Sequence, residues 1–145
     1  MLKIDQLSFW EKKSYFEDID FLIIGAGIVG LSTAIYLKQR HYKAKIMVVE
    51  RGYLPTGAST KNAGFACFGS PTELKDDLRS MSENDLWDMV DLRYRGLNRL
   101  FSLIEKERLN YQACCSWDLI REGDDILDPE FIHYLNENTF KITGI

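Results

Sequence analysis

Residues 20–30 read Asp-Phe-Leu-Ile-Ile-Gly-Ala-Gly-Ile-Val-Gly, and this stretch decides the fold. Its first five residues, 20–24, form a short, largely apolar run that is typical of a buried parallel strand. The pattern Gly-x-Gly-x-x-Gly follows at once, from Gly25 to Gly30. Apolar residues then recur at helical spacing over 28–40, which predicts a helix. A glycine pattern between a strand and a helix is the usual context of a dinucleotide-binding turn.

Each of the three glycines has a physical reason in such a turn. Gly25 allows the chain to turn tightly out of the strand, and Gly27 leaves room for a pyrophosphate to approach the backbone. Gly30 allows the helix to pack closely on the strand. The N-terminus of the helix offers free N–H groups and the positive end of its dipole to phosphates. The turn is therefore a candidate pyrophosphate site.

A second apolar run, over 45–49, ends at Glu50 and predicts another buried strand. Strand, helix and strand within about 30 residues form one βαβ unit, which predicts an α/β, Rossmann-like fold. Glu50 lies 20 residues after Gly30, where a carboxylate accepts hydrogen bonds from an adenosine ribose. The same carboxylate repels a 2′-phosphate and so favours FAD or NAD over NADP, although the neighbouring Arg51 could accommodate that phosphate. Spacing alone leaves FAD and NAD open.

The rest of the chain is expected to be a loop followed mainly by helices. Glycine, serine, threonine and proline are frequent over 52–71, which predicts a loop. The other expected elements are a short helix over 71–81, a longer helix over 83–107 capped by Ser82, a strand over 115–121, a turn over 122–125 and a last helix that begins at Asp128-Pro129. The longer helix carries an apolar stripe expected to lie in the core, made of Leu86, Val90, Tyr94, Leu97, Phe101 and Ile104.

Composition excludes several classes of protein. The chain has 145 residues, a net charge of −4 and 46% hydrophobic residues, which suits a globular protein and argues against a nucleic-acid binder. It has no run of the ~20 apolar residues that a transmembrane helix needs. It has three cysteines, and because this number is odd, no disulfide framework is expected. The cysteines also lack Cys-x-x-Cys spacing, so no metal site is expected. A cytoplasmic location is the simplest interpretation. Cys67 is expected to be a small buried residue.

The loop after Glu50 adds a family resemblance. Residues 51–64, Arg-Gly-Tyr-Leu-Pro-Thr-Gly-Ala-Ser-Thr-Lys-Asn-Ala-Gly, resemble the second flavin-contacting loop of the D-amino-acid oxidase/glycine oxidase family. Members of that family share the glycine pattern, the acid that ends the second strand and a small-residue Ala-Gly turn. The resemblance is close over 20–70 and looser beyond. It implies FAD as cofactor and an oxidoreductase that oxidises an amine or amino acid by hydride transfer to the flavin.

The resemblance also assigns cofactor-binding residues one by one. It places Gly25, Ala26, Gly27, Ile28, Val29 and Gly30 at the pyrophosphate turn, Glu50 at the ribose with Arg51 beside the adenine, Ala58, Ser59 and Thr60 along the pyrophosphate and ribityl chain, and Ala63, Gly64 and Phe65 beside the isoalloxazine ring. Small residues suit the last turn, because the backbone must approach a flat ring closely. Asn62, between these segments, is expected to hold an unusual backbone angle.

Family members are longer than this chain, so the chain is expected to be the N-terminal, FAD-binding part of an enzyme and to be inactive alone. Its catalytic residues are then expected outside this sequence. The expected organisation is a lead-in over 1–19, the FAD-binding βαβ unit and flavin-contacting loop over 20–70, a helical segment over 71–112 and the incomplete start of a substrate domain over 113–145. The alternatives are an NAD-dependent dehydrogenase and a non-catalytic nucleotide-binding fragment.

Overall fold

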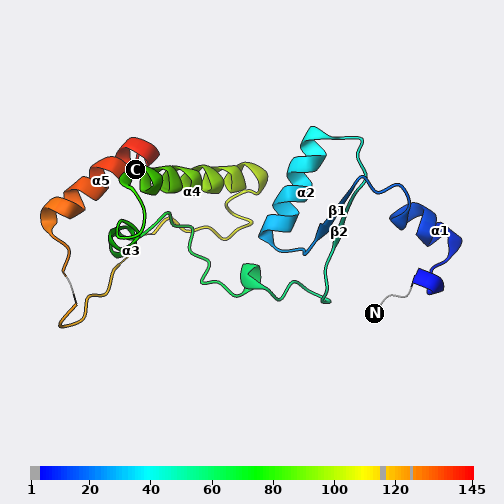
Figure 1. Ribbon diagram of the computed structural model, residues 1–145, viewed down its shortest axis with the longest axis horizontal. Coiled ribbons are helices and arrows are strands. Elements are labelled where there is room, and N and C mark those ends of the chain that lie inside the picture. The colour runs from blue at the N-terminus through cyan, green and yellow to red at the C-terminus, as the bar shows by residue number, and fades with distance from the viewer. Residues whose placement is uncertain (1–3, 115–116, 125) are drawn as a thin grey trace. The chain divides into compact units, whose positions relative to one another are not determined.

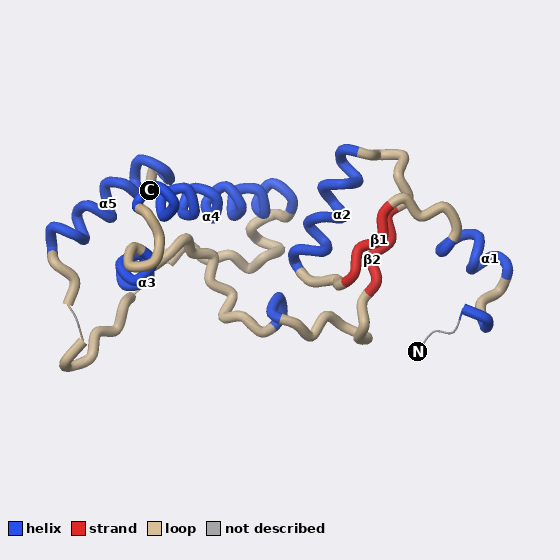
Figure 2. Tube along the Cα trace, viewed as in Figure 1, coloured by secondary structure: helices blue, strands red, loops and turns tan. Residues whose placement is uncertain are grey.

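Figure 1 shows the computed structural model of the chain, which describes residues 4–114, 117–124 and 126–145. These residues form two compact units, Met1–Gly64 and Phe65–Ile145. The first unit contains the two described strands, drawn red in Figure 2, and the second contains helices joined by loops. Within the part of the chain that the structure describes, no helix is long and apolar enough to cross a membrane.

The first unit contains the predicted βαβ arrangement. Strand β1 (Phe21–Ile24) leads through the glycine turn into helix α2 (Ile28–Arg40), and strand β2 (Ile46–Val49) follows. The two strands pair in parallel with Phe21 opposite Ile46 and Ile24 opposite Val49. Helix α2 lies against both strands (Figure 1). The predicted strand–helix–strand order is therefore confirmed, with bounds that differ by at most one residue.

Helix α2 covers only one face of this narrow sheet. Its partly covered side includes Gly30, Ala34 and Leu37, which recur at helical spacing. On the other face of β1, Leu22 and Ile24 are 57% and 84% exposed. Two strands are too few to cover the whole apolar surface of the helix. Much of the apolar surface of this unit, taken by itself, is therefore exposed.

A short helical segment precedes β1. It consists of a 3-10 turn (Ile4–Gln6), helix α1 (Phe9–Glu11) and a π-helical turn (Lys12–Phe16). Ser8 caps α1, because its hydroxyl accepts the N–H of Glu11 while the Glu11 carboxylate accepts the N–H of Ser8.

The second unit packs three helices around a small apolar core. Its helices are α3 (Pro71–Asp77), α4 (Glu83–Leu103) and α5 (Pro129–Thr143). The side chains of Ser70, Ser82 and Asp128 accept backbone N–H groups at the three N-termini, so the predicted cap at Ser82 and the predicted start of the last helix at Asp128-Pro129 are confirmed. The buried core consists of Leu74 from α3, Leu86 and Val90 from α4, and Leu135 from α5.

Two predicted helices end earlier than expected. The helix predicted over 71–81 ends at Asp77, and the one predicted over 83–107 ends at Leu103. Ile104 is extended and 39% exposed, so it leaves the predicted core stripe. The chain then turns back and packs Tyr111 edge-on against Phe101, with ring centroids 4.8 Å apart. A continued helix would carry Tyr111 away from this contact, which explains the early end.

The strand predicted over 115–121 is wrong where it can be judged. Residues 115 and 116 lie outside the described residues, and 117–121 have no regular secondary structure. Trp117 and Leu119 are 86% and 92% exposed, and the Asp118 carboxylate accepts the backbone N–H of Thr72. A strand needs a partner, and the sheet that the structure describes pairs only β1 with β2.

Candidate cofactor-binding site

The glycine turn continues directly from the sheet. The N–H of Gly25 donates to the carbonyl of Val49 at 2.7 Å, which extends the parallel pairing by one bond beyond β1. Gly25 then adopts a φ of +101°, which side chains disfavour. The chain therefore reverses from strand to helix at the one residue type that tolerates this angle.

Gly30 allows α2 to lie against this turn without a gap. A Cβ added at Gly30 would lie 2.0 Å from the carbonyl oxygen of Gly25 and 3.4 Å from a methyl group of Ile23. Because the closer atom belongs to the backbone, no side-chain rotation could relieve the overlap. Helix and strand meet here at a distance that only glycine permits.

Gly27 caps α2 and faces the loop that follows β2. The N–H of Leu31 donates to the Gly27 carbonyl at 3.0 Å, and the hydroxyl oxygen of Ser59 accepts the N–H of Ile28 at 2.9 Å. A Cβ added at Gly27 would lie 2.9 Å from that hydroxyl oxygen. Gly27 and Ser59 thus form a close-fitting cradle over the helix N-terminus, with no room for a side chain at Gly27.

Glu50 contacts the same glycine turn through its side chain. One carboxylate oxygen accepts the N–H of Ala26 at 2.9 Å, and the other accepts the N–H of Gly52 at 3.2 Å. These hydrogen bonds lower the pKa of Glu50, with the Ala26 N–H having the larger effect. The exposed side chain is therefore an anion at neutral pH, held against the glycine turn 24 residues before it.

The loop after β2 is held by its own side chains. A 3-10 turn (Ala58–Thr60) carries Ser59. The Thr60 hydroxyl donates toward the carbonyls of Pro55 and Gly57, 3.0 and 3.2 Å away. Asn62 bonds backbone groups on both sides of itself. The expectation of an unusual backbone angle at Asn62 is wrong: Gly64, with φ +75°, takes that angle instead.

The structure brings together only some of the residues assigned from the sequence. Ala26 meets Glu50, and Ile28 meets Ser59, across 24 and 31 residues of sequence. Phe65 belongs to the second unit and is 81% exposed. Of the other assigned residues, Val29 and Gly30 lie in the first turn of α2, and the rest lie in the glycine turn and the loop: Gly25, Gly27, Arg51, Ala58, Thr60, Ala63 and Gly64. Cys67, expected to be buried, is exposed, because the loop that carries it packs little surface.

The residues present fit a dinucleotide. The turn offers the Ser59 hydroxyl beside the Ile28 N–H, a position without a side chain at Gly27 and an anionic acceptor at Glu50, which also accepts the Ala26 N–H. Donors at a helix N-terminus suit phosphate oxygens, and the carboxylate suits ribose hydroxyls. Residues 20–134 match the family model described as FAD dependent oxidoreductase.

The chain belongs to this family of FAD-dependent oxidoreductases. Its cofactor is accordingly FAD, as the resemblance of the loop over 51–64 implies. No individual curated protein and no solved structure matched the chain. The family assignment therefore rests on the match over 20–134, which covers most of the sequence.

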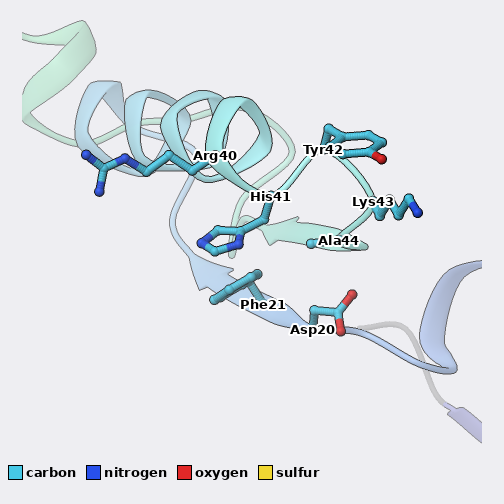
Figure 3. Close-up of a pocket in the computed structure, with 7 residues that line it drawn as sticks. All are labelled: Asp20, Phe21, Arg40, His41, Tyr42, Lys43 and Ala44. Carbon is cyan, nitrogen blue, oxygen red and sulfur yellow. The ribbon is translucent and has the colours of Figure 1, made fainter.

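A separate depression of this flavoprotein lies at the other end of the strands. Figure 3 shows its lining, which comes from the start of β1, the end of α2 and the turn that follows α2. The lining residues are Asp20, Phe21, Arg40, His41, Tyr42, Lys43 and Ala44. Ligands of parallel α/β sheets bind at the carboxyl ends of the strands, so this depression is not the FAD site. No group of three or more His, Cys, Asp or Glu side chains within the described ranges could hold a metal ion.

Replacing Glu50 with alanine is expected to weaken FAD binding about ten- to a hundredfold, because hydrogen bonds to a charged acceptor are lost. Glu50→Gln should have a smaller effect, since its amide oxygen still accepts one hydrogen bond. Titration of the cofactor-free protein with FAD, followed by flavin fluorescence, measures both variants. Equal affinity in Glu50→Ala and the unmodified protein would exclude a contact between Glu50 and the cofactor.

The same carboxylate gives a defined pH dependence. A lowered pKa in the folded state means that the ionised form of Glu50 contributes stability above its ordinary pKa of 4.5. This contribution is lost as the pH falls through the lowered value. Stability from Glu50 is therefore constant from neutral pH down to about pH 5 and declines only below it.

Proposed function

We propose that this chain forms the FAD-binding portion of an enzyme that oxidises an amine or amino acid. The observation that carries the proposal is the hydrogen bond between the Glu50 carboxylate and the Ala26 N–H, 2.9 Å long. It holds an adenosine-binding acid beside a phosphate-binding turn, as a dinucleotide requires. The likeness of residues 51–64 to a flavin-contacting loop supports the amine or amino-acid substrate.

In this proposal the chain holds FAD through its turn and loop. In the turn, Gly27 leaves room for the pyrophosphate and Ile28 lies beside it through the Ser59 hydroxyl, while Gly25, Ala26, Val29 and Gly30 shape the turn. The other contacts are Glu50 at the adenosine ribose, Arg51 beside the adenine, Ala58, Ser59 and Thr60 along the pyrophosphate and ribityl chain, and Ala63, Gly64 and Phe65 beside the isoalloxazine ring. The Ser59 hydroxyl accepts the Ile28 N–H, and among the described residues its own proton has no acceptor, so it suits a phosphate oxygen.

The chemistry comes from the cofactor, which when bound accepts a hydride equivalent from the C–H bond next to the amine nitrogen. The residues of this chain bind and orient. We assign none of them as a catalytic acid, base or substrate clamp, and the 145 residues by themselves are proposed to give no turnover. The proposal retains the division into 1–19, 20–70, 71–112 and 113–145, and it includes a cytoplasmic location, in keeping with the free thiols of Cys67 and Cys114.

The intact enzyme, of which this chain is proposed to be the FAD-binding portion, is expected to be yellow and to release FAD rather than FMN on denaturation. Only FAD carries the adenosine that Glu50 is placed to bind, so the anion beside the turn would have no partner on FMN. A visible spectrum followed by chromatography of the released cofactor tests this. A colourless protein that instead retains NADH would contradict the proposal and favour a nicotinamide-dependent dehydrogenase.

A further inference from the structure

One side chain joins the two parts of the loop assigned to the cofactor. The Asn62 amide nitrogen donates to the carbonyl of Ala58 at 3.1 Å and to that of Ser59 at 3.0 Å. Its amide oxygen accepts the N–H of Gly64 at 2.8 Å. A single carboxamide therefore bonds the 3-10 turn before it and the Ala63-Gly64 turn after it.

The partners of Asn62 fix the orientation of its amide group. Two carbonyl oxygens can only accept, so they require the NH₂ end, and the N–H of Gly64 requires the oxygen end. Rotating the amide by half a turn would bring donor against donor and acceptor against acceptor. Both amide protons are then in use. Asn62 therefore has no donor left for a cofactor. A direct contact between its NH₂ group and the cofactor does not explain why an asparagine stands at this position of the loop.

The bonds of Asn62 extend to the helix N-terminus. Ser59, whose carbonyl Asn62 binds, accepts the N–H of Ile28 at the start of α2 through its hydroxyl. On the other side, Gly64 has a φ of +75°, a conformation that a hydrogen bond to its N–H can hold. The carboxamide thus connects the turn at the pyrophosphate end with the turn at the isoalloxazine end.

We propose that Asn62 is a positioning residue, which sets the spacing between the phosphate-side turn at Ser59 and the flavin-side turn at Gly64. This inference rests on the proposed assignment of both turns to FAD. The Asn62 side chain acts through the backbone of its neighbours and does not itself bind the cofactor. Its role differs from that of Glu50, which is proposed to contact the ribose.

The experiment compares Asn62→Ala, Asn62→Asp and the matched control Asn136→Ala, which makes the same truncation at an exposed position of α5. Asn62→Asp keeps an acceptor for the Gly64 N–H but removes the donors to Ala58 and Ser59. Amide hydrogen exchange of the cofactor-free protein reports on the loop, and FAD titration reports on binding. The visible spectrum at saturating FAD reports on the surroundings of the ring.

Asn62→Ala is expected to weaken FAD binding about tenfold, to speed exchange of the Gly64 amide about tenfold and to shift the flavin absorption maximum. Asn62→Asp should keep the Gly64 amide protected and still bind FAD about tenfold more weakly. Asn136→Ala should change none of these. The Gly25 amide, bonded to Val49, should stay protected in every variant and so shows that the βαβ unit remains folded.

Three results would decide against the inference. Normal FAD affinity and an unshifted spectrum in both Asn62 variants would overturn it and leave the proposed function standing. Unchanged exchange at Gly64 in Asn62→Ala would overturn it as well, since the turn would then hold without the carboxamide. Failure of the unmodified protein to bind FAD would contradict the proposed function first, and the inference with it. If the Gly25 amide exchanges faster in Asn62→Ala, the βαβ unit of that variant is no longer folded. The FAD affinity and the spectrum of Asn62→Asp then test the inference alone.

Discussion

Gly30→Ala is expected to unfold the βαβ unit or leave it too unstable to retain FAD. The added methyl group would lie 2.0 Å from the Gly25 carbonyl oxygen, a distance at which the atoms must move. The positions of the methyl carbon and of the carbonyl oxygen are both fixed by the backbone, so α2 would have to shift away from β1. Overpacking of this kind costs roughly 3 kcal/mol at the upper end of its usual range. The first unit, taken by itself, is expected to have a small free energy of unfolding, because much of its apolar surface is exposed.

The control for this prediction is the same substitution at another helical glycine. Gly96 lies inside α4, and a Cβ added there meets no atom within 4 Å. Gly96→Ala is therefore expected to stabilise α4 by up to about 1 kcal/mol, the usual difference in helix propensity. Amide exchange along β1 and β2, together with thermal melts followed by circular dichroism, compares the two variants. A Gly30→Ala protein with normal protection of the Gly25 amide would contradict the close packing described here.

The βαβ unit was predictable because its signals are local. A short apolar run, a glycine pattern and a helical repeat each specify their own element, and β1 and β2, which follow each other in the chain, pair directly. The end of α4 was not predictable in the same way. The apolar stripe continues to Ile104, but the helix ends at Leu103, where packing of Tyr111 on Phe101 favours a turn. Contacts between side chains that meet only after folding override the repeat.

The candidate site was likewise predictable only in part. The sequence places an acid at the end of β2, but only the structure shows its carboxylate at the Ala26 N–H. The role of Asn62 was missed, because its three bonds depend on how the loop closes on itself. The signal that could have found it is an asparagine two residues before a glycine, the spacing at which its side chain bonds a following N–H. That spacing also explains why Gly64, and not Asn62, takes the left-handed angle.

Gly27→Val is expected to lower FAD affinity more than a hundredfold while the βαβ unit stays folded. A Cβ at this position would lie 2.9 Å from the Ser59 hydroxyl oxygen, which belongs to a side chain that can rotate away. Gly27 also has φ −75° and ψ 177°, an extended conformation that valine adopts readily. The fold can therefore absorb the change, unlike the change at Gly30. The two methyl groups of valine would instead fill the cradle over the helix N-terminus.

The loss of binding then follows from space and hydrogen bonding together. A pyrophosphate could no longer approach the start of α2, and the Ser59 hydroxyl, which is proposed to donate to it, would be displaced from its place beside Ile28. Gly27→Ala is the graded control, with one carbon in place of three and a smaller expected loss. Flavin content after purification measures binding, and protection of the Gly25 amide measures folding. Full retention of FAD by a folded Gly27→Val protein would mean that the pyrophosphate lies elsewhere than over this turn.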